Sequence, residues 1–200
     1  MSMDSSMWDD RYRSTELLWS ADPNRFVRDF FSDREPGRVV DLGCGEGRNA
    51  IWLAGQGWQV TGVDFSQVAL DRGATLSEDR GVTVDWVRAD LAEWGVAEPA
   101  FDAALICYIH LPRPVMAHLF ASALASLVTG GELLVIGHHS RNLVEGVGGP
   151  QMPDVLYSPA DVTEILGADN VVEARDVFRN VEMPGGAKVA IDTYVVAKRA

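Results

Sequence analysis

The sequence predicts an α/β fold, a doubly wound sheet of seven strands that is mostly parallel and ends in an antiparallel hairpin. Three observations carry this prediction. Between residues 37 and 139, short apolar runs alternate with segments of helical periodicity, which is typical of parallel strands joined by right-handed crossovers. The turn GCGEG directly follows the first apolar run. Near the end of the chain, two strand-like runs are separated only by MPGGA, which leaves no room for a crossover helix.

Each element has its own signal. NRFVRDFF has helical spacing, and GRVVDLG has the pattern of a short buried strand ended by glycine. Ser66 stands where an N-cap is needed, and Pro114 is placed to open a later helix. Helices are expected over residues 24–31, 49–57, 66–80 and 114–128. Strands are expected over residues 37–43, 58–66, 82–90, 100–109, 131–139, 170–182 and 187–199.

Composition indicates one domain over residues 1–200. The chain is 47% hydrophobic and 23% charged, which suffices for a full core. We expect a helical cap over residues 1–36 and a sheet domain over residues 37–200, with a long loop over residues 140–158 that suits a lid or a binding loop. Neither a run of 18 apolar residues nor a secretory signal is readable, so a cytoplasmic protein without a membrane partner is expected.

The charge balance argues against nucleic acid as a partner. The chain has 29 acidic and 17 basic residues and a formal net charge of -12, and its arginines form no run. A phosphate backbone would therefore be repelled on average. The two cysteines, Cys44 and Cys107, each lie inside an expected structural element rather than in a spaced framework, so neither a disulfide nor a cysteine metal site is expected.

Acidic residues stand at the ends of three expected strands. Asp41, Asp64 and Asp90 lie at or near the carboxyl ends of the first, second and third strands, and the glycine turn lies where the first strand becomes a helix. This edge of a doubly wound sheet binds ligands, and an acid after the second strand can accept both hydroxyls of a ribose. A tight connection between the first strand and the following helix would by itself explain the glycines of the turn. The acids and glycines together indicate a nucleotide-like ligand.

The residues after the turn disfavour two nucleotide classes. A triphosphate loop needs Gly-Lys-Ser/Thr, whereas Gly47 is followed by Arg48 and Asn49. A dinucleotide fingerprint would need glycine at position 48, and its pyrophosphate would lie beside Asp41 and Glu46. An acidic turn suits a ligand that carries positive charge.

These motifs resemble a known family. VVDLGCGEGRNA, the acid in GVDFS, RADL and the terminal hairpin look like the class I S-adenosylmethionine-dependent methyltransferases over nearly the whole chain. Within that superfamily, GCGEGRNAIWLAGQGWQVTGVDFS, preceded by WDDRY and ADPNRF, is similar to the tellurite-resistance-type branch of small methyltransferases. The resemblance implies a Rossmann-like methyltransferase fold with S-adenosyl-L-methionine as cofactor. The cofactor-binding residues that it implies are Asp41, Gly43, Cys44, Gly45, Asp64, Phe65, Ser66, Ala89, Asp90, Leu91, Cys107 and Tyr108.

The resemblance also implies how the turn and the second strand hold the cofactor. Gly43 and Gly45 would lie against its methionine part, with Asp41 near the ammonium group. Asp64 would hold the ribose hydroxyls. We expect Asp64 to be an exposed strand-end acid with no structural partner, so that its loss would leave folding almost unchanged.

The remaining implied contacts concern the adenine and the sulfonium. Phe65 and Leu91 would flank the adenine, although core packing explains both equally well. Asp90 would accept the exocyclic amine. Cys107 and Tyr108 would face the sulfonium, with Cys107 as a small lining residue rather than a nucleophile.

Methyl transfer needs a positioned acceptor and requires a base only when the acceptor carries a proton. The catalytic candidates are Tyr108, His110 and His139, and His138 also lies near the expected mouth of the site. His138 and His139 are neighbours on a strand and point to opposite faces, so no metal site is expected. CYIHLP lacks the Pro-Pro pattern of enzymes that methylate amide or base nitrogens. A small molecule is therefore the expected acceptor, namely a thiol, hydroxyl, carboxylate or metalloid anion.

Several alternatives stay open. Residues 7–24, with Trp8, Tyr12 and Trp19, either fold over the cofactor as a lid or pack on the sheet edge. A sensor that binds adenosylmethionine or adenosylhomocysteine without catalysis is the rival from another class. A nicotinamide-dependent oxidoreductase is disfavoured by Arg48 and by the closing hairpin. The sequence leaves the acceptor's identity and the oligomeric state open.

Overall fold

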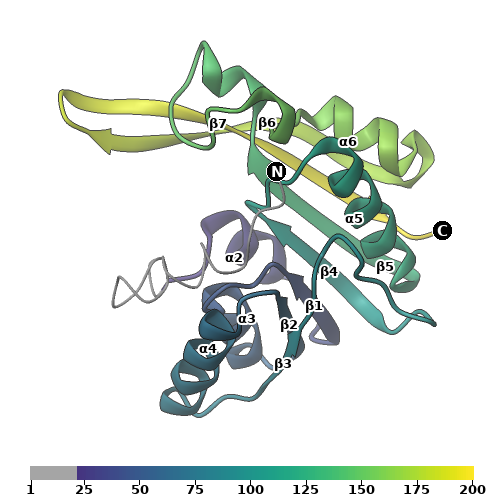
Figure 1. Cartoon of the computed structure of the whole chain (residues 1–200). Helices are drawn as coiled ribbons and strands as arrows, with labels where there is room; N and C mark the ends of the chain where they lie inside the picture. The colour runs from purple at the N-terminus through teal and green to yellow at the C-terminus, as the bar shows by residue number, and fades with distance from the viewer. Residues whose placement is uncertain (1–21) are drawn as a thin grey trace. The chain divides into compact units, whose positions relative to one another are not determined.

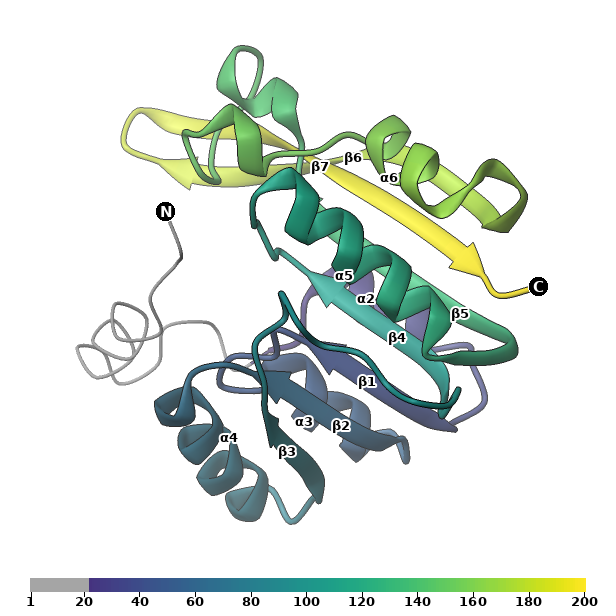
Figure 2. The same ribbon diagram turned by 45° about the vertical axis from the view of Figure 1, so that its right-hand side comes forward.

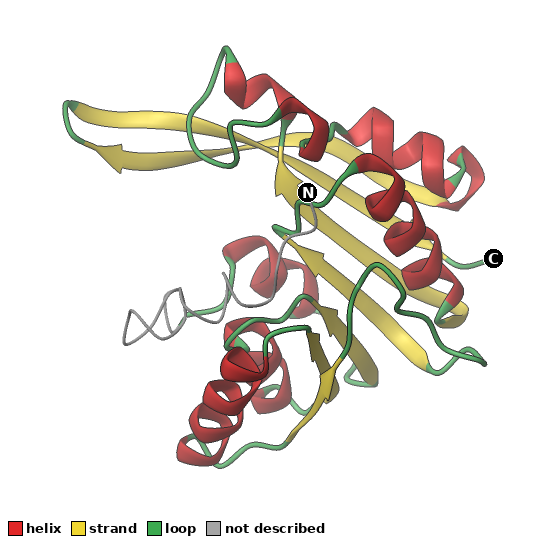
Figure 3. Cartoon of the chain, in the orientation of Figure 1, coloured by secondary structure: helices red, strands yellow, loops and turns green. Residues whose placement is uncertain are grey.

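A seven-stranded sheet in the order β3-β2-β1-β4-β5-β7-β6 forms the protein, in a computed structural model that describes residues 22–200 (Figure 1). The strands are β1 (Arg38–Leu42), β2 (Gln59–Asp64), β3 (Val84–Arg88), β4 (Phe101–Cys107), β5 (Leu127–His138), β6 (Val171–Met183) and β7 (Gly186–Lys198). The α-helices are α2 (Arg25–Phe31), α3 (Arg48–Gly55), α4 (Gln67–Asp79), α5 (Arg113–Ala125) and α6 (Pro159–Leu166). Figure 3 shows how helices and strands follow one another along the chain. The predicted fold class is confirmed, including the antiparallel end.

The chain divides into two compact units. The first runs up to Trp94 and includes Phe101–Leu105, and the second consists of Gly95–Ala100 and Ile106–Ala200. Within the described part of the chain no helix is long and apolar enough to cross a bilayer. The predicted lid residues Trp8, Tyr12 and Trp19 lie outside the described residues.

The first unit is built on parallel strands. β1 pairs with β2 and β2 pairs with β3, both in parallel. The inward side chains are apolar and fully or almost fully buried, among them Val39, Val40, Leu42, Leu53 and Val63. Ser66 caps α4 as expected, because its side chain accepts a hydrogen bond from the amide of Ala69. Parallel pairing brings the carboxyl ends of β1, β2 and β3 to the same edge of this unit.

Trp86 on β3 packs against three glycines. A Cβ added at Gly47, Gly62 or Gly73 would lie 2.2, 3.0 or 2.6 Å from its ring. Gly47, the N-cap of α3, also has a φ of 82°, which only glycine adopts readily. Gly47, the third glycine of the turn, therefore leaves room for the Trp86 ring, which packs between the turn, α4 and β3.

A pair of helix glycines tests this packing. We expect Gly73→Ala to lower the free energy of unfolding by about 1 to 3 kcal/mol, because the new methyl would overlap the Trp86 ring. Gly55→Ala, in α3, is the matched control, since a Cβ there meets no atom within 4 Å. It should stabilise the protein by up to about 1 kcal/mol through helix propensity. Urea unfolding measures both, and a Gly73→Ala variant as stable as Gly55→Ala would contradict the packing.

The second unit is dominated by antiparallel pairing. β7 lies between β5 and β6, and Asp192–Lys198 pair with β5 whereas Gly186–Ile191 pair with β6 alone. The β6–β7 hairpin therefore extends past the end of β5 (Figure 2). Helices α5 and α6 lie side by side against the strands of this unit (Figure 2).

The segment between β5 and β6 is more ordered than the sequence indicated. It contains three short 3-10 helices, η1 (Ser140–Leu143), η2 (Pro153–Val155) and η3 (Ala168–Asn170), and α6 between the last two, and the sequence analysis assigned no element to any of them. Asn142 ties the loop to β7 through two 2.7 Å hydrogen bonds with the backbone of Ile191. Ser158 and Asp161 form a capping box that starts α6. The sequence SPAD contains this capping signal. The helix was not predicted because SPAD follows a glycine- and proline-rich run.

Candidate functional site

The turn between β1 and α3 is folded back onto the end of β2. The amides of Gly43 and Cys44 both donate to the carbonyl of Val63, at 2.8 and 3.0 Å. Gly43 and Gly45 have positive φ angles of 74° and 56°, and these backbone conformations strongly favour glycine. Cys44 is buried, which raises the pKa of its thiol. This thiol therefore stays protonated and is a poor nucleophile.

Asp64 is buried and joins the turn to β2. Its side chain accepts hydrogen bonds from the amides of Gly45 and Ser66, each at 2.9 Å, and the residue is only 5% exposed. The expectation of an exposed acid without a structural partner is therefore wrong. A carboxylate at the end of a strand lies beside turns whose backbone amides are not used in strand pairing. Such buried amides need acceptors, and the Asp64 carboxylate provides them.

Asp41 is buried at the end of β1, and one of its oxygens has no hydrogen-bond donor. The residue is 1% exposed, and Oδ2 lacks a partner among the described residues. Burial raises the pKa of Asp41 to about 7, with repulsion from Asp64 in the same direction and the charge of Arg48 opposing it. An unpaired buried carboxylate oxygen is costly unless a cation or donor arrives. Asp41 is thus poised to receive a positively charged group.

The turn after β3 completes this edge of the first unit. The amide of Ala89 donates to the backbone carbonyl of Asp64 at 3.0 Å, which holds the two strand ends together. Asp90 is exposed, and its carboxylate accepts from the amide of Ala92 at 2.9 Å. Phe65 is half-buried, whereas Leu91 is 7% exposed. The structure thus places the first ten predicted cofactor residues, Asp41 to Leu91, along one continuous edge of this unit.

The second unit contains a polar cluster around Asp192. This carboxylate is fully buried and receives hydrogen bonds from the Tyr108 hydroxyl at 2.7 Å, from His138 Nδ1 at 3.2 Å and from both Nε and one terminal nitrogen of Arg179. Tyr108 has a φ of 58°, the single positive value at a non-glycine position among the described residues. His110 stacks on His138 with 5.2 Å between ring centroids. We call these five residues the Asp192 cluster.

Sequence reasoning missed two members of the cluster. Arg179 and Asp192 come from the C-terminal hairpin, 71 and 84 positions after Tyr108 (179 − 108 and 192 − 108). In VAIDTYVV an acid looks like an ordinary residue of an alternating strand. A weak signal was available, because Asp192 interrupts the most apolar stretch of the hairpin.

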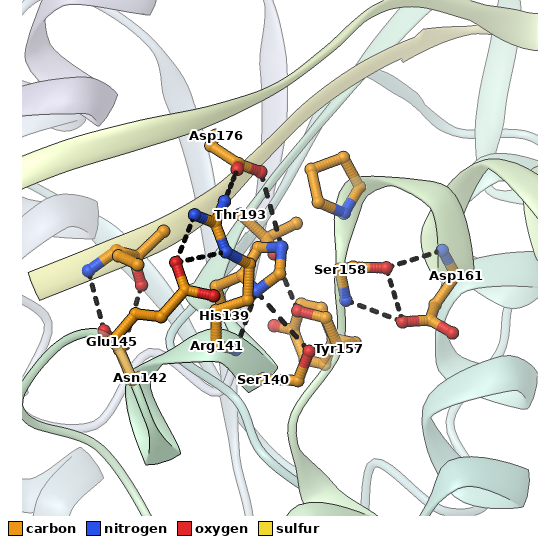
Figure 4. Close-up of polar contacts among 12 residues, drawn as sticks. His139, Ser140, Arg141, Asn142, Glu145, Tyr157, Ser158, Asp161, Asp176 and Thr193 are labelled. Carbon is orange, nitrogen blue, oxygen red and sulfur yellow. Dashed lines mark hydrogen bonds and ion pairs between the residues drawn. The ribbon is translucent and has the colours of Figure 1, made fainter.

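His139, which directly follows β5, is engaged in structural contacts. Its Nδ1 accepts from the amide of Arg141 at 2.9 Å, and its Nε2 lies 3.4 Å from Asp176 Oδ1 (Figure 4). Arg141 in turn bridges Asp176 and Glu145. The residue is 5% exposed, and burial lowers the pKa of its imidazole. Both ring nitrogens therefore hold η1 onto β6, and a catalytic role for His139 stays a prediction.

Comparisons with known proteins agree with this architecture. Residues 39–131 match the family described as "Methyltransferase domain". A ubiquinone biosynthesis O-methyltransferase of Alkalilimnicola ehrlichii is 30% identical over 143 residues, which is 69% of this chain and 57% of that protein. The chain thus spans a little over half the length of this relative.

Solved structures show the same fold at low sequence identity. TehB from Haemophilus influenzae superposes with a TM-score of 0.75 at 17% identity, covering 98% of this chain and 67% of TehB. Magnesium protoporphyrin IX methyltransferase from Synechocystis, crystallised with bound SAH, gives 0.67 at 19% identity over 96% of this chain and 83% of that one. Residues 39–131 therefore resemble a methyltransferase domain, and the chain shares the Rossmann-like fold of these two solved structures.

Proposed function

We propose that this protein transfers a methyl group from S-adenosylmethionine to a small-molecule acceptor, and that residues 1–200 act as one methyltransferase domain. The observation that carries the proposal is the buried Oδ2 of Asp41 beside the glycine turn, which has no hydrogen-bond partner within residues 22–200. Adenosylmethionine has an ammonium group on its methionine part and is the positively charged nucleotide-like ligand that this edge suits. Its sulfonium supplies an activated methyl group when it is bound.

The residues present fit this cofactor. Asp41 offers an unpaired oxygen for the ammonium group, and the glycines of the turn let the methionine part approach the backbone. The two oxygens of Asp64 accept the amides of Gly45 and Ser66, and a carboxylate offers about four acceptor sites. We propose that Asp64 accepts the ribose hydroxyls in addition to these two amides.

A small acceptor is supported by charge and by the relatives. The formal net charge of -12 disfavours a nucleic acid substrate. The relative above is named for ubiquinone biosynthesis and the solved structure for magnesium protoporphyrin IX, which are both small molecules. Thiols, hydroxyls, carboxylates and metalloid anions form the proposed acceptor class, and membership of the tellurite-resistance-type branch is part of the proposal. Tyr108 and His110, both in the Asp192 cluster, are the proposed acceptor-side residues.

A direct test is titration of the protein with adenosylmethionine, followed by detection of adenosylhomocysteine after incubation with small thiols and phenols. Binding followed by acceptor-dependent product supports the proposal. Absence of adenosylmethionine binding would contradict it. Binding without product from any acceptor would favour a sensor.

The affinity for adenosylmethionine should rise with pH. Asp41 must lose its proton to receive the ammonium group, and its pKa is about 7. Each pH unit below that value costs about tenfold, so the affinity near pH 5 should be about 100-fold below its plateau. Calorimetry in two buffers of different ionisation enthalpy should detect proton release on binding below pH 7, and Asp41→Asn should bind weakly with no such pH dependence.

The free energy of unfolding of the protein without cofactor should change with pH in the opposite direction. The folded state holds the Asp41 proton more tightly than the unfolded chain, so this group lowers stability as pH rises from about 4 to about 7.

A pH-independent affinity for adenosylmethionine would contradict the role given to Asp41.

A further inference from the structure

Strand β6 is the edge strand of the sheet in the second unit. It pairs with β7 on one side, and no strand of residues 22–200 pairs with its other side. β6 is 13 residues long, whereas strands in globular proteins usually have about five or six. A long edge strand presents a row of backbone donors and acceptors to which a strand of another chain can add.

Most of β6 lacks two devices that protect edge strands from such pairing. Natural edges are often interrupted by a bulge or carry proline or lysine. β6 contains neither proline nor lysine, and its register shift lies between Val171 and Glu173, at the very start of the strand. The stretch 173–183 is therefore regular. Phe178 lies at its centre and is 57% exposed.

The charges of this stretch favour a second copy of the chain over a strongly acidic or basic partner. The stretch holds three acidic and two basic residues, which gives a formal net charge of -1 (2 − 3), whereas the whole chain carries -12. A nearly neutral strand neither attracts a highly charged partner nor repels its own copy at this edge.

Antiparallel pairing of two β6 strands is possible in only a few registers. Residues directly opposite each other point to the same face of the sheet, so around a two-fold axis their numbers must add up to an even number. One residue then faces its own copy at the axis. An axis at Arg175, Asp176 or Arg179 would set like charges opposite each other, which is destabilising. An axis at Val177 would set Arg175 opposite Arg179.

An axis at Phe178 avoids these conflicts and uses the whole regular stretch. The opposed pairs are Phe178 with its copy, Val177–Arg179, Asp176–Asn180, Arg175–Val181, Ala174–Glu182 and Glu173–Met183. Each charged residue faces an uncharged one, and the exposed aromatic rings meet at the axis. This pairing gives about ten backbone hydrogen bonds, as in a typical stable interface. An axis nearer to either end would pair seven residues or fewer (171–177 or 177–183).

We propose that the protein is a homodimer in which two copies join their β6 strands antiparallel around a two-fold axis at Phe178. The sheet then continues from one copy into the other. This assembly depends on the geometry of the second unit alone and is independent of the proposed reaction.

The first test is the mass of the protein in solution. Sedimentation velocity over a range of concentrations should show a dimer, and Phe178→Lys should weaken its association at least about tenfold, because two lysines would face each other at the axis. Val172→Lys is the matched control, since Val172 is 65% exposed on the same strand but precedes the paired stretch. A monomer at every concentration, or an equal effect of both changes, would overturn the proposal.

The second test asks whether position 178 faces its own copy. Phe178→Glu should also weaken the dimer, whereas an equimolar mixture of Phe178→Lys and Phe178→Glu should associate as a heterodimer through opposite charges. Circular dichroism of each variant would show that the fold is retained, as expected for an exposed position. Folded variants that stay apart in the mixture would contradict an axis at Phe178.

The third test fixes the register by disulfide formation. Phe178→Cys should give a covalent dimer on mild oxidation, because directly opposed residues have their Cα atoms about 4.5 to 5.5 Å apart. Asn180→Cys should not, since its two copies would lie roughly 14 Å apart. The unaltered protein, with Cys44 and Cys107, is the control for other cross-links. Cross-linking through position 180 but not through position 178 would overturn the register.

Discussion

Replacing Asp64 with alanine is expected to weaken adenosylmethionine binding at least tenfold to a hundredfold and also to destabilise the protein. Without the carboxylate, the bound cofactor would lose two charge-assisted hydrogen bonds from its ribose hydroxyls. Its removal also leaves the amides of Gly45 and Ser66 without their acceptor. Each unpaired buried amide costs about 1 to 3 kcal/mol, so the free energy of unfolding should fall by about 2 to 6 kcal/mol. Calorimetric titration and urea unfolding measure the two effects.

Two variants control this experiment. Asp64→Asn keeps the size and one acceptor oxygen, so its affinity should lie between those of the wild type and Asp64→Ala. Asp85→Asn changes an exposed acid on the neighbouring strand β3 and should leave both quantities unchanged within about 0.5 kcal/mol. Wild-type affinity in Asp64→Ala would contradict the site, and wild-type stability would contradict its structural contacts.

Replacing Asp192 with alanine is expected to cost about 3 to 5 kcal/mol of unfolding free energy. Asp192 is fully buried, and its loss leaves the half-buried guanidinium of Arg179 without its counter-ion. Removing one partner of a buried ion pair is costly because the remaining charge stays desolvated. The same change frees the Tyr108 hydroxyl and His138 Nδ1. Thermal and urea unfolding would report the loss.

A neighbouring ion pair provides the matched comparison. Arg175 and Glu173 lie on the same strand, β6, with side chains about half exposed, and exposed pairs contribute about 1 kcal/mol or less. Glu173→Gln, which removes this pair and keeps Arg175 over the Tyr194 ring, should therefore be almost neutral. If Asp192→Ala were as mild as Glu173→Gln, the Asp192 cluster would not be a buried network.

The sequence predicted the sheet because its signals are local. Alternating apolar and helical segments, the Ser66 cap and the MPGGA turn each depend on neighbours within a few residues. The expected ends of the strands agree with the structure to within a few positions up to β4. Helix α6 was missed, although its capping box is equally local, because it follows a long run of loop-forming residues.

Side-chain partners could not be predicted in the same way. Asp64 was placed correctly at the end of β2, but the amide of Gly45 that it accepts comes from a turn 19 positions earlier. His138 and Asp192 are 54 positions apart and meet only because β7 pairs with β5. Such contacts depend on which distant strands become neighbours in the sheet, and β5 and β7 are separated by more than 40 positions of loop, helix and strand.

The measurement that tests the account most directly is a crystal structure of the protein grown with S-adenosylhomocysteine. We predict the ligand's ammonium group within hydrogen-bond distance of Oδ2 of Asp41, and its ribose hydroxyls on the carboxylate of Asp64, with the amide of Gly45 still bound to Asp64. A ligand that lies away from the turn between β1 and α3, or an ammonium group that leaves Asp41 unpaired, would contradict the central claim.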